Sequence, residues 1–303
     1  MSGFTERDVP DQTGRTIIVT GANTGIGFGG ASILARKGAR VLLACRDEAK
    51  ARDAMTRILA ETPDADLAFL PLDLGDLDSV RRAADLAGDE ARIDALYNNA
   101  GIMMPPLRHT AQGFESQFGV NHLGVFALTG LLLDKLAQAP DPRIAVTSSL
   151  AHRRGHIAWD DLDGRQDYNK FKRYGMSKLA NILHVLELDR RLRVAGSNIV
   201  VAGCHPGAAS SDLGREMGNS PFVQKILQRF FNTSERGAMP GVQIVTAPDV
   251  ISGGYYGPQG IMELRGASGP AKRAKQARSV ADAKRLWDLS VELTGVDPGL
   301  PPA

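Results

Sequence analysis

The chain contains very little cysteine: Cys45 and Cys204 are the only two among 303 residues. Both lie in apolar, strand-like runs, so we interpret them as buried thiols rather than a disulfide framework. This favours a reducing, cytoplasmic location. The chain also lacks an excess of charge of one sign, with 36 Lys and Arg against 34 Asp and Glu. A net charge of +2 argues against nucleic-acid partners, and the basic run Lys272–Arg278 is interpreted as a solvated face.

Long hydrophobic runs are scarce as well. The most apolar stretch, Val125–Leu133, is about half the length that spans a bilayer. Residues 1–14 are polar and show no apolar core before a cleavage site, which argues against a secretory signal. We therefore expect no membrane anchor. The overall composition, 43% hydrophobic and 23% charged, is ordinary for a globular chain that buries its own core.

Short β-type runs alternate with longer helical runs through most of the chain. Strands are expected at Thr16–Thr20, Arg40–Ala44, Leu67–Leu72, Ala95–Asn98, Arg143–Ser148, Asn198–Cys204 and Gly254–Tyr256. Helices are expected at Gly25–Lys37, Glu48–Ala60, Leu77–Leu86, Gly113–Ala137, Tyr174–Val194 and Glu235–Ala247. This alternation predicts right-handed crossovers. The expected fold is α/β: a single Rossmann-type, doubly wound parallel sheet of about seven strands, with helices on both faces.

The domain organisation follows from the lack of a linker before residue 205. We predict a single domain over residues 1–303. Residues 206–235 depart from the alternation and are expected to form a lid, and residues 257–303 a C-terminal extension. Within this extension, Gly257–Arg278 is rich in Pro, Gly and basic residues and is predicted to be surface loop, whereas Ala281–Leu293 is predicted to be an amphipathic closing helix.

A glycine-rich turn, Thr20–Gly27, joins the first predicted strand to the first predicted helix. This is the structural context that a dinucleotide site requires. Gly21 permits a tight turn, and Gly25 and Gly27 remove side chains where a pyrophosphate and the helix must approach closely. The helix N-terminus then offers free N–H groups and a positive dipole to phosphates. The turn therefore predicts a dinucleotide cofactor.

The glycine spacing is G-x-x-x-G-x-G, and Asn98-Asn99-Ala100-Gly101 follows the fourth predicted strand. Both segments resemble signatures of the short-chain dehydrogenase/reductase family, and the resemblance covers nearly the whole chain. It implies a nicotinamide-dependent oxidoreductase. The cofactor contacts that it implies in these two segments are Gly21, Asn23, Thr24, Gly25, Ile26, Gly27, Asn99, Ala100 and Gly101.

The end of the second strand bears on the choice between NADP and NAD. Arg46 follows it, 19 residues after Gly27, and no acidic residue precedes it. A guanidinium binds a 2′-phosphate well, which favours NADP(H) and leaves NAD as the alternative. The neighbouring Asp47 is interpreted as the start of the next helix. The resemblance also implies adenine contacts from Asp73 and Leu74, although Asp73 could instead cap the helix that starts at Leu77.

Tyr174 and Lys178 lie four residues apart in a predicted helix, so both side chains are expected on one face. An ammonium near a phenol favours the phenolate, which makes a tyrosine a usable acid and base near neutral pH. The family resemblance implies that Tyr174 is the catalytic acid/base and that Lys178 also holds the nicotinamide ribose. An exposed helical pair would be the structural alternative.

The same resemblance supplies two further catalytic candidates. A serine hydroxyl at the end of the fifth strand can hydrogen-bond the substrate oxygen; we choose Ser149 and keep Ser148 as the alternative. Asn121 matches the fourth family member, an asparagine that kinks the long helix and supports a water relay from the lysine. The segment after the sixth strand resembles a turn beside the nicotinamide, which implies contacts from Pro206 and Gly207. Ser211 stands near the position where the family often has threonine.

Two features point to one branch of the family. The first is the long gap of 25 positions between Ser149 and Tyr174, which carries the run Trp159–Leu162. The second is the pair of runs Asn121–Gly124 and Ser177–Asn181. Together these segments are similar to those of retinol dehydrogenases and WW-domain oxidoreductases. Val125, where that branch often has histidine, is a departure. We expect NADP(H)-dependent interconversion of a carbonyl and an alcohol on a small, lipophilic substrate. The alternatives are reduction of a C=C bond, as in protochlorophyllide reductases, and a cofactor-binding sensor without turnover.

Two further expectations concern metals and assembly. His152 and His156 are four residues apart, but no Cys or acidic residue completes a metal set at a known spacing, so no metal site is predicted. Relatives often associate through the two long helices, here Gly113–Ala137 and Tyr174–Val194. The resemblance therefore implies a homodimer or homotetramer, and the sequence alone does not decide whether this chain associates.

Overall fold

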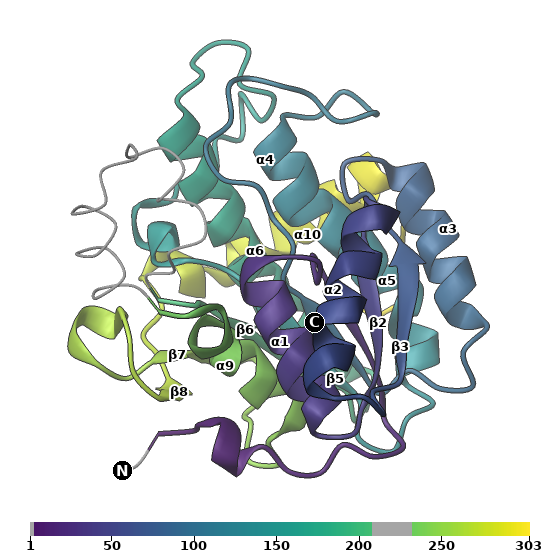
Figure 1. Ribbon diagram of the computed structural model, residues 1–303. Helices are drawn as coiled ribbons and strands as arrows, with labels where there is room; N and C mark the ends of the chain where they lie inside the picture. Colours follow the sequence, from purple (N-terminus) through teal and green to yellow (C-terminus); the bar gives the residue numbers. More distant parts are fainter. Residues whose placement is uncertain (1–2, 208–231) are drawn as a thin grey trace, which may run out of the picture.

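An eight-stranded sheet forms the centre of the computed structural model, which describes residues 3–207 and 232–303 (Figure 1). The strands lie in the order β3-β2-β1-β4-β5-β6-β7-β8. Their bounds are Thr16–Thr20 for β1, Arg40–Cys45 for β2, Leu67–Pro71 for β3, Ala95–Asn98 for β4, Arg143–Thr147 for β5, Val200–Cys204 for β6, Tyr255–Pro258 for β7 and Ser268–Pro270 for β8. Only the pairing of β7 with β8 is antiparallel within this described sheet. The predicted doubly wound fold is confirmed.

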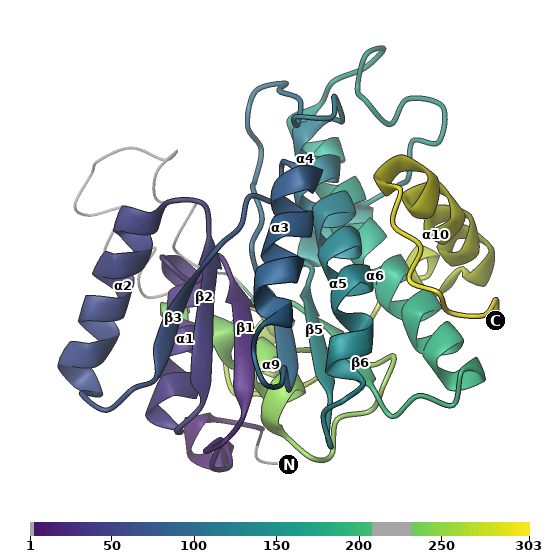
Figure 2. The ribbon, with the colours of Figure 1, turned by 90° about the vertical axis from the view of Figure 1, so that its right-hand side faces the viewer.

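Helices cover both faces of the sheet (Figure 2). One face carries α1 (Gly25–Arg36), α2 (Glu48–Glu61) and α9 (Ser234–Thr246), and the other carries α3 (Leu77–Gly88), α5 (Gly124–Leu136) and α6 (Lys170–Val194). Successive residues of a strand point to opposite faces, so Ile17 and Val19 enter one core and Ile18 the other. Burial on both sides explains why these strands are continuous apolar runs.

The strand order reverses beside β1. The chain builds β2 and β3 on one side of β1 and then places β4, β5 and β6 on the other. In open α/β sheets such a switch point leaves a crevice at the carboxyl ends of the strands, where ligands bind. Strands β1, β4 and β5 end there at Thr20, Asn98 and Thr147, so the segments that follow them meet at one place.

The long helix predicted at Gly113–Ala137 is shorter and interrupted. It consists of α4 (Ser116–Phe118), a π-helical turn at Gly119–Leu123 and α5. The helix begins late because the Glu115 carboxylate caps it, accepting hydrogen bonds from the amides of the second and third helical residues. The π-helical turn contains Asn121, where the kink was expected.

One helical run in the described part of the chain, Ser116–Leu136, is long and apolar enough to cross a membrane by length and composition alone. The apolar stretch expected from the sequence, Val125–Leu133, is only part of this run. The structure buries 83% of its most apolar window inside the protein, which is the usual state of a core helix.

Two other boundaries differ from the expectation. Helix α6 begins at Lys170, four residues before Tyr174, because the Asn169 side chain accepts hydrogen bonds from the first-turn amides. The loop predicted over Gly257–Arg278 contains strand β8, which pairs with β7 and, on its other side, with Phe4. A three-residue strand that ends in Gly-Pro is too short to show an alternating pattern.

The closing helix α10 (Val280–Thr294) packs mainly against α6, beside which it lies in Figure 2, and also contacts α5. The Trp287 ring stands edge-on to Phe126, with 5.1 Å between centroids, and the Arg191 guanidinium lies 4.6 Å from the Trp287 centroid. Helix α10 thus covers part of the face on which the family resemblance places a dimer. Association of this chain with a second copy stays a prediction.

Candidate active site

The glycine turn between β1 and α1 has the backbone that its sequence predicts. Gly21 and Gly25 adopt left-handed φ angles of 68° and 55°. A β-carbon at Gly27 would lie 2.3 Å from the Gly21 carbonyl oxygen and 2.5 Å from the Asn99 side-chain nitrogen. Neither distance is tolerable, so the turn can close only over glycine. Asn23, Gly25 and Ile26 are half-buried along its rim, and Thr24 is exposed.

These features fit a dinucleotide. Thr24 precedes α1 in extended conformation, but its side chain does not cap the helix. The first-turn N–H groups of α1 are therefore left without a side-chain cap, at the positive end of a twelve-residue helix. Backbone donors in this position, beside a turn without side chains, are suited to a pyrophosphate.

Thr20 ties this turn to the segment after β4. Its hydroxyl oxygen accepts hydrogen bonds of 2.9 Å from the amides of both Asn99 and Ala100. The Asn99 side-chain amide in turn donates to the Thr20 carbonyl oxygen at 3.0 Å. The two sequence signatures, Thr20–Gly27 and Asn98–Gly101, are therefore hydrogen-bonded to each other. This role of Thr20 was not predicted from the sequence, although Thr20 belongs to the glycine motif.

Asn121 holds the next part of that segment. Its side-chain oxygen accepts from the Ile102 amide at 2.7 Å, while its amide group donates to the Ile102 carbonyl at 2.9 Å and to the Ser177 hydroxyl at 3.0 Å. Asn121 is fully buried. It thereby joins the π-helical turn, the loop after β4 and helix α6.

Lys178, on α6, also lies next to the loop after β4. A β-carbon at Gly101 would lie 3.0 Å from the Asn121 side-chain oxygen and 3.2 Å from Lys178 Nζ, so these three residues converge. Lys178 Nζ also donates to the Thr147 carbonyl at the end of β5, at 3.3 Å. Tyr174, one helical turn away, is half-buried, and its ring centroid lies 5.7 Å from Lys178 Nζ.

The two candidate serines differ in how their hydroxyl groups are used. Ser148 is buried and donates its hydroxyl proton to the Lys178 carbonyl oxygen at 2.7 Å. Ser149 is half-buried, and its oxygen accepts from the Ala151 amide at 3.2 Å, which leaves its proton available as a donor. This geometry favours Ser149, the residue chosen from the sequence.

The segment after β2 presents Arg46, whose side chain is 68% exposed and lies 3.9 Å from the Asp73 carboxylate. Asp47 caps α2 by accepting from the Lys50 amide at 3.1 Å, as expected, and this bond lowers the pKa of Asp47. Asp73 does not cap α3, because Asp76 occupies that position. Asp73 instead accepts from the Gly75 amide at 2.8 Å.

Leu74 and the two cysteines have buried side chains. The Leu74 side chain is buried in the core, so only its backbone could face a cofactor. Cys45 and Cys204 are both buried free thiols, as predicted, and burial raises the pKa of Cys45 to about 11 and that of Cys204 to about 12.

The turn after β6 contains His205, Pro206 and Gly207. Gly207 has a left-handed φ of 73°, and a β-carbon there would lie 2.3 Å from the Leu264 carbonyl oxygen. The buried His205 ring accepts the Gly207 amide at Nδ1, at 3.2 Å. Burial lowers the pKa of His205 to about 4. Ser211 and most of the predicted lid lie outside the described residues.

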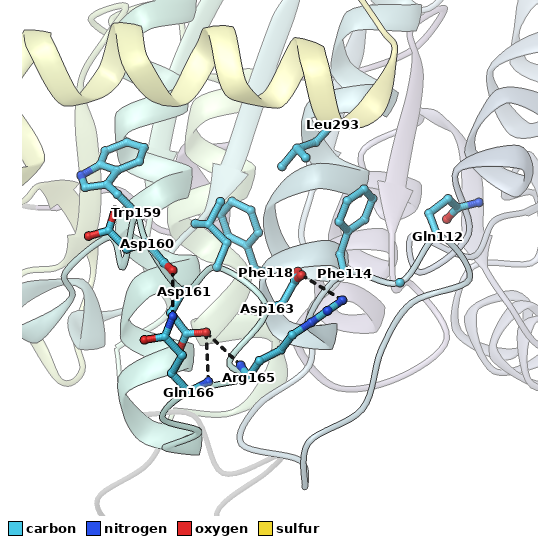
Figure 3. Close-up of a pocket in the computed structure, with 12 residues that line it drawn as sticks. Gln112, Phe114, Phe118, Trp159, Asp160, Asp161, Asp163, Arg165, Gln166 and Leu293 are labelled. Atoms are coloured by element: carbon cyan, nitrogen blue, oxygen red, sulfur yellow. Dashed lines mark hydrogen bonds and ion pairs between the residues drawn. The ribbon is translucent and has the colours of Figure 1, made fainter.

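A pocket of about 470 Å³ lies between the loop before α4, the segment Trp159–Gln166 before α6 and the end of α10 (Figure 3). Phe114, Phe118 and Leu293 form apolar walls, and Asp161 on the rim accepts backbone hydrogen bonds from Arg165 and Gln166. None of the candidate catalytic residues lines it. The segment Trp159–Gln166, part of the long gap between Ser149 and Tyr174, thus shapes a pocket apart from the candidate catalytic residues.

Within residues 3–207 and 232–303, no three His, Cys, Asp or Glu side chains are grouped so as to hold a metal ion. The pair considered from the sequence is also unsuited to one. His152 uses both ring nitrogens, Nδ1 with the Ser149 carbonyl at 2.6 Å and Nε2 with the Ala274 amide at 3.2 Å. The absence of a metal cofactor stays a prediction.

Comparison with known proteins agrees with this geometry. Residues 15–221 match the family model for the short chain dehydrogenases. The chain is 42% identical to human retinol dehydrogenase 13 over 294 residues, covering 94% of this chain and 86% of that protein. It is 38% identical to mouse retinol dehydrogenase 12 over 286 residues, covering 93% of this chain and 87% of that protein.

Solved structures show the same likeness. An uncharacterized protein from Mycobacterium paratuberculosis superposes with a TM-score of 0.82 at 37% identity, covering 98% of this chain and 99% of that one. The Pseudomonas aeruginosa RhlG/NADP active-site complex superposes with a TM-score of 0.63 at 26% identity, covering 80% and 94%. The chain therefore belongs to the short-chain dehydrogenase family and is an oxidoreductase related to the retinol dehydrogenases.

Proposed function

We propose that this enzyme interconverts a carbonyl and an alcohol on a small lipophilic molecule, using NADP(H), with Tyr174 as the acid/base. The observation that carries the proposal is the convergence of Gly101, Asn121 and Lys178 beside Tyr174, at the switch point of the sheet. The phenol and the cation lie together on α6, and the half-buried Ser149 follows β5 at the edge of the sheet where open α/β folds bind ligands.

When bound, the nicotinamide ring supplies or accepts the hydride. Tyr174 would donate its phenolic proton to the carbonyl oxygen in reduction and take it back in oxidation. The Lys178 ammonium favours the negative charge left on the phenolic oxygen, because it lies one helical turn away with its Nζ 5.7 Å from the ring. Ser149 would donate to the substrate oxygen as charge develops there.

Asn121 has a supporting role in this scheme. Its contacts with Ile102 and Ser177 hold the loop after β4 against α6, and so keep Gly101 next to Lys178. The remaining cofactor contacts are proposed for the glycine turn and for Asn99, Ala100, Pro206 and Gly207.

The preference for NADP(H) rests on Arg46. Its exposed guanidinium follows β2, where a 2′-phosphate would be recognised, and the neighbouring Asp47 carboxylate is occupied as the cap of α2. The names of the relatives, retinol dehydrogenases, support a lipophilic alcohol or aldehyde as the substrate class. A cytoplasmic location and a single domain with a lid stay predictions.

The test is a substrate panel assayed with NADPH and with NADH. Medium-chain and isoprenoid aldehydes and ketones are compared with conjugated enones of similar size, and product analysis identifies the reduced bond. We expect carbonyl reduction, faster with NADPH. Reduction of the double bond alone would favour a C=C reductase. A protein that binds NADPH and turns over neither set would instead be a sensor.

A further inference from the structure

Glu263 lies outside the residues considered so far, yet it bonds to two turns of the candidate site. One carboxylate oxygen, Oε2, accepts from Arg153 at 2.6 Å and pairs with His205 at 3.2 Å. Its other oxygen, Oε1, accepts from the Lys272 amide at 3.5 Å. Three segments that are far apart in sequence therefore meet at this one carboxylate.

The His205 contact reaches the turn after β6. Because the Gly207 amide donates to Nδ1, a neutral His205 carries its proton on Nε2 and donates it to Glu263. The imidazole lies close against Gly257, where a β-carbon would be 2.1 Å from Nε2 and 2.5 Å from Cδ2. Glu263 thereby fixes the ring that holds Gly207.

The Arg153 contact reaches the other turn. Arg153 belongs to the 3-10 turn Leu150–Arg154, which begins directly after Ser149 and uses the Ser149 hydroxyl as its cap. His152 in the same turn donates from Nδ1 to the Ser149 carbonyl, because its Nε2 accepts the Ala274 amide. The position of Ser149 thus depends on how this turn is held.

The backbone around Glu263 is unusual. Met262 and Glu263 have φ angles of 55° and 59°, in the left-handed region that non-glycine residues rarely adopt. Among the non-glycine residues described, Met104 is the only other with a positive φ. Such a conformation persists when contacts on the side chain determine it, and the carboxylate supplies those contacts here.

We propose that Glu263 is a positioning residue, which sets the turn carrying Ser149 relative to the turn carrying Gly207. The inference rests on the proposed function, because these turns would present the substrate hydroxyl donor and the nicotinamide contact. Glu263 itself touches neither candidate group. It acts through Arg153 on one side and through His205 on the other.

Amide hydrogen exchange of the protein without cofactor tests the placement directly. In Glu263→Ala the amides of Gly207 and Ala151 should exchange faster by about tenfold, and Glu263→Gln should restore part of the protection. Arg153→Met should loosen Ala151 more than Gly207, because it removes one arm only. Glu90→Ala is the matched control. Glu90 also pairs with an arginine, Arg40 at 2.8 Å, and its side chain is 21% exposed against 20% for Glu263.

Kinetics supply the second measurement. In Glu263→Ala we expect kcat to fall by about tenfold while the NADPH Kd changes by less than about threefold, since the glycine turn is intact. Unchanged exchange at both amides would overturn the proposal. So would faster exchange throughout the chain with a parallel loss of NADPH binding, which would show a purely structural role. If the wild-type enzyme turns over no carbonyl, the proposed function fails, while the exchange data still decide whether Glu263 holds the two turns.

Discussion

The stability of this enzyme should fall in mild acid because of two buried histidines between α5, α6 and α10. His122 and His184 lie with ring centroids 6.1 Å apart, beside Phe126 and Trp287. His122 donates from Nε2 to the Ser290 hydroxyl, at 2.9 Å, but within the described residues neither nitrogen of His184 has a hydrogen-bond partner. Burial lowers the pKa of His122 to about 3 and that of His184 to about 4.

These values set the direction and size of the effect. In the unfolded chain a histidine titrates near pH 6.5, so below that pH the unfolded state binds protons that the native state does not, and stability is lost as the pH falls. The loss is about 1.4 kcal/mol per histidine for each pH unit between 6.5 and the native pKa. At about pH 5 the two histidines together should cost about 4 kcal/mol of unfolding free energy, relative to about pH 7.5.

The perturbation is His184→Leu, which removes half of this term together with two unpartnered polar atoms. We expect the variant to be as stable as the wild type or more stable at about pH 7.5, and to lose about 2 kcal/mol less than the wild type on going to about pH 5. Urea unfolding followed by tryptophan fluorescence measures both values, with His156→Leu on the surface as the control. Equal losses in wild type and His184→Leu would refute the reasoning.

Three further predictions concern the site. Arg46→Ala should reduce the ratio of kcat/KM for NADPH over NADH by about tenfold, measured by steady-state kinetics, because the 2′-phosphate loses its guanidinium; an unchanged ratio would show that another group selects the cofactor. Ser149→Ala should lower kcat by about a hundredfold, whereas Ser148→Ala should mainly lower Tm, since that hydroxyl is bonded to a backbone carbonyl; the reverse pattern would exchange their roles. Gly27→Ala should weaken NADPH binding by about tenfold or more in calorimetric titration, given the 2.3 Å approach to the Gly21 carbonyl.

Much of the fold was predictable because its signals are local. Strands β1 and β4 have the predicted bounds, since continuous apolar runs bounded by turn residues are typical of strands buried on both faces. Helix ends were less predictable where a side chain decides them. Asn169 caps α6, which begins four residues before the predicted start, and Glu115 delays the start of α4. Strand β8 depends on pairing with β7 and Phe4, which no local pattern reveals.

The candidate site was likewise predictable where its signals are local and not where they depend on the fold. The glycine turn and the pair Tyr174 and Lys178 were predicted from their spacing and Asn121 from the family resemblance, and the structure brings Lys178 and Asn121 together at Gly101. The choice between Ser148 and Ser149 needed geometry, because only the fold shows which hydroxyl proton is already used. Glu263 could not be found from sequence, since its partners lie 110 and 58 positions away. The lid prediction lies mostly outside the described residues.

The most direct test of the central claim is single-turnover hydride transfer in Tyr174→Phe. The enzyme is saturated with NADPH, mixed with an aldehyde that the wild type reduces, and followed by the loss of reduced nicotinamide absorbance. Removing one hydroxyl group should slow this step by about a thousandfold while the NADPH Kd stays within about threefold of the wild-type value. A variant that transfers hydride at the wild-type rate would contradict the assignment of Tyr174 as the acid/base.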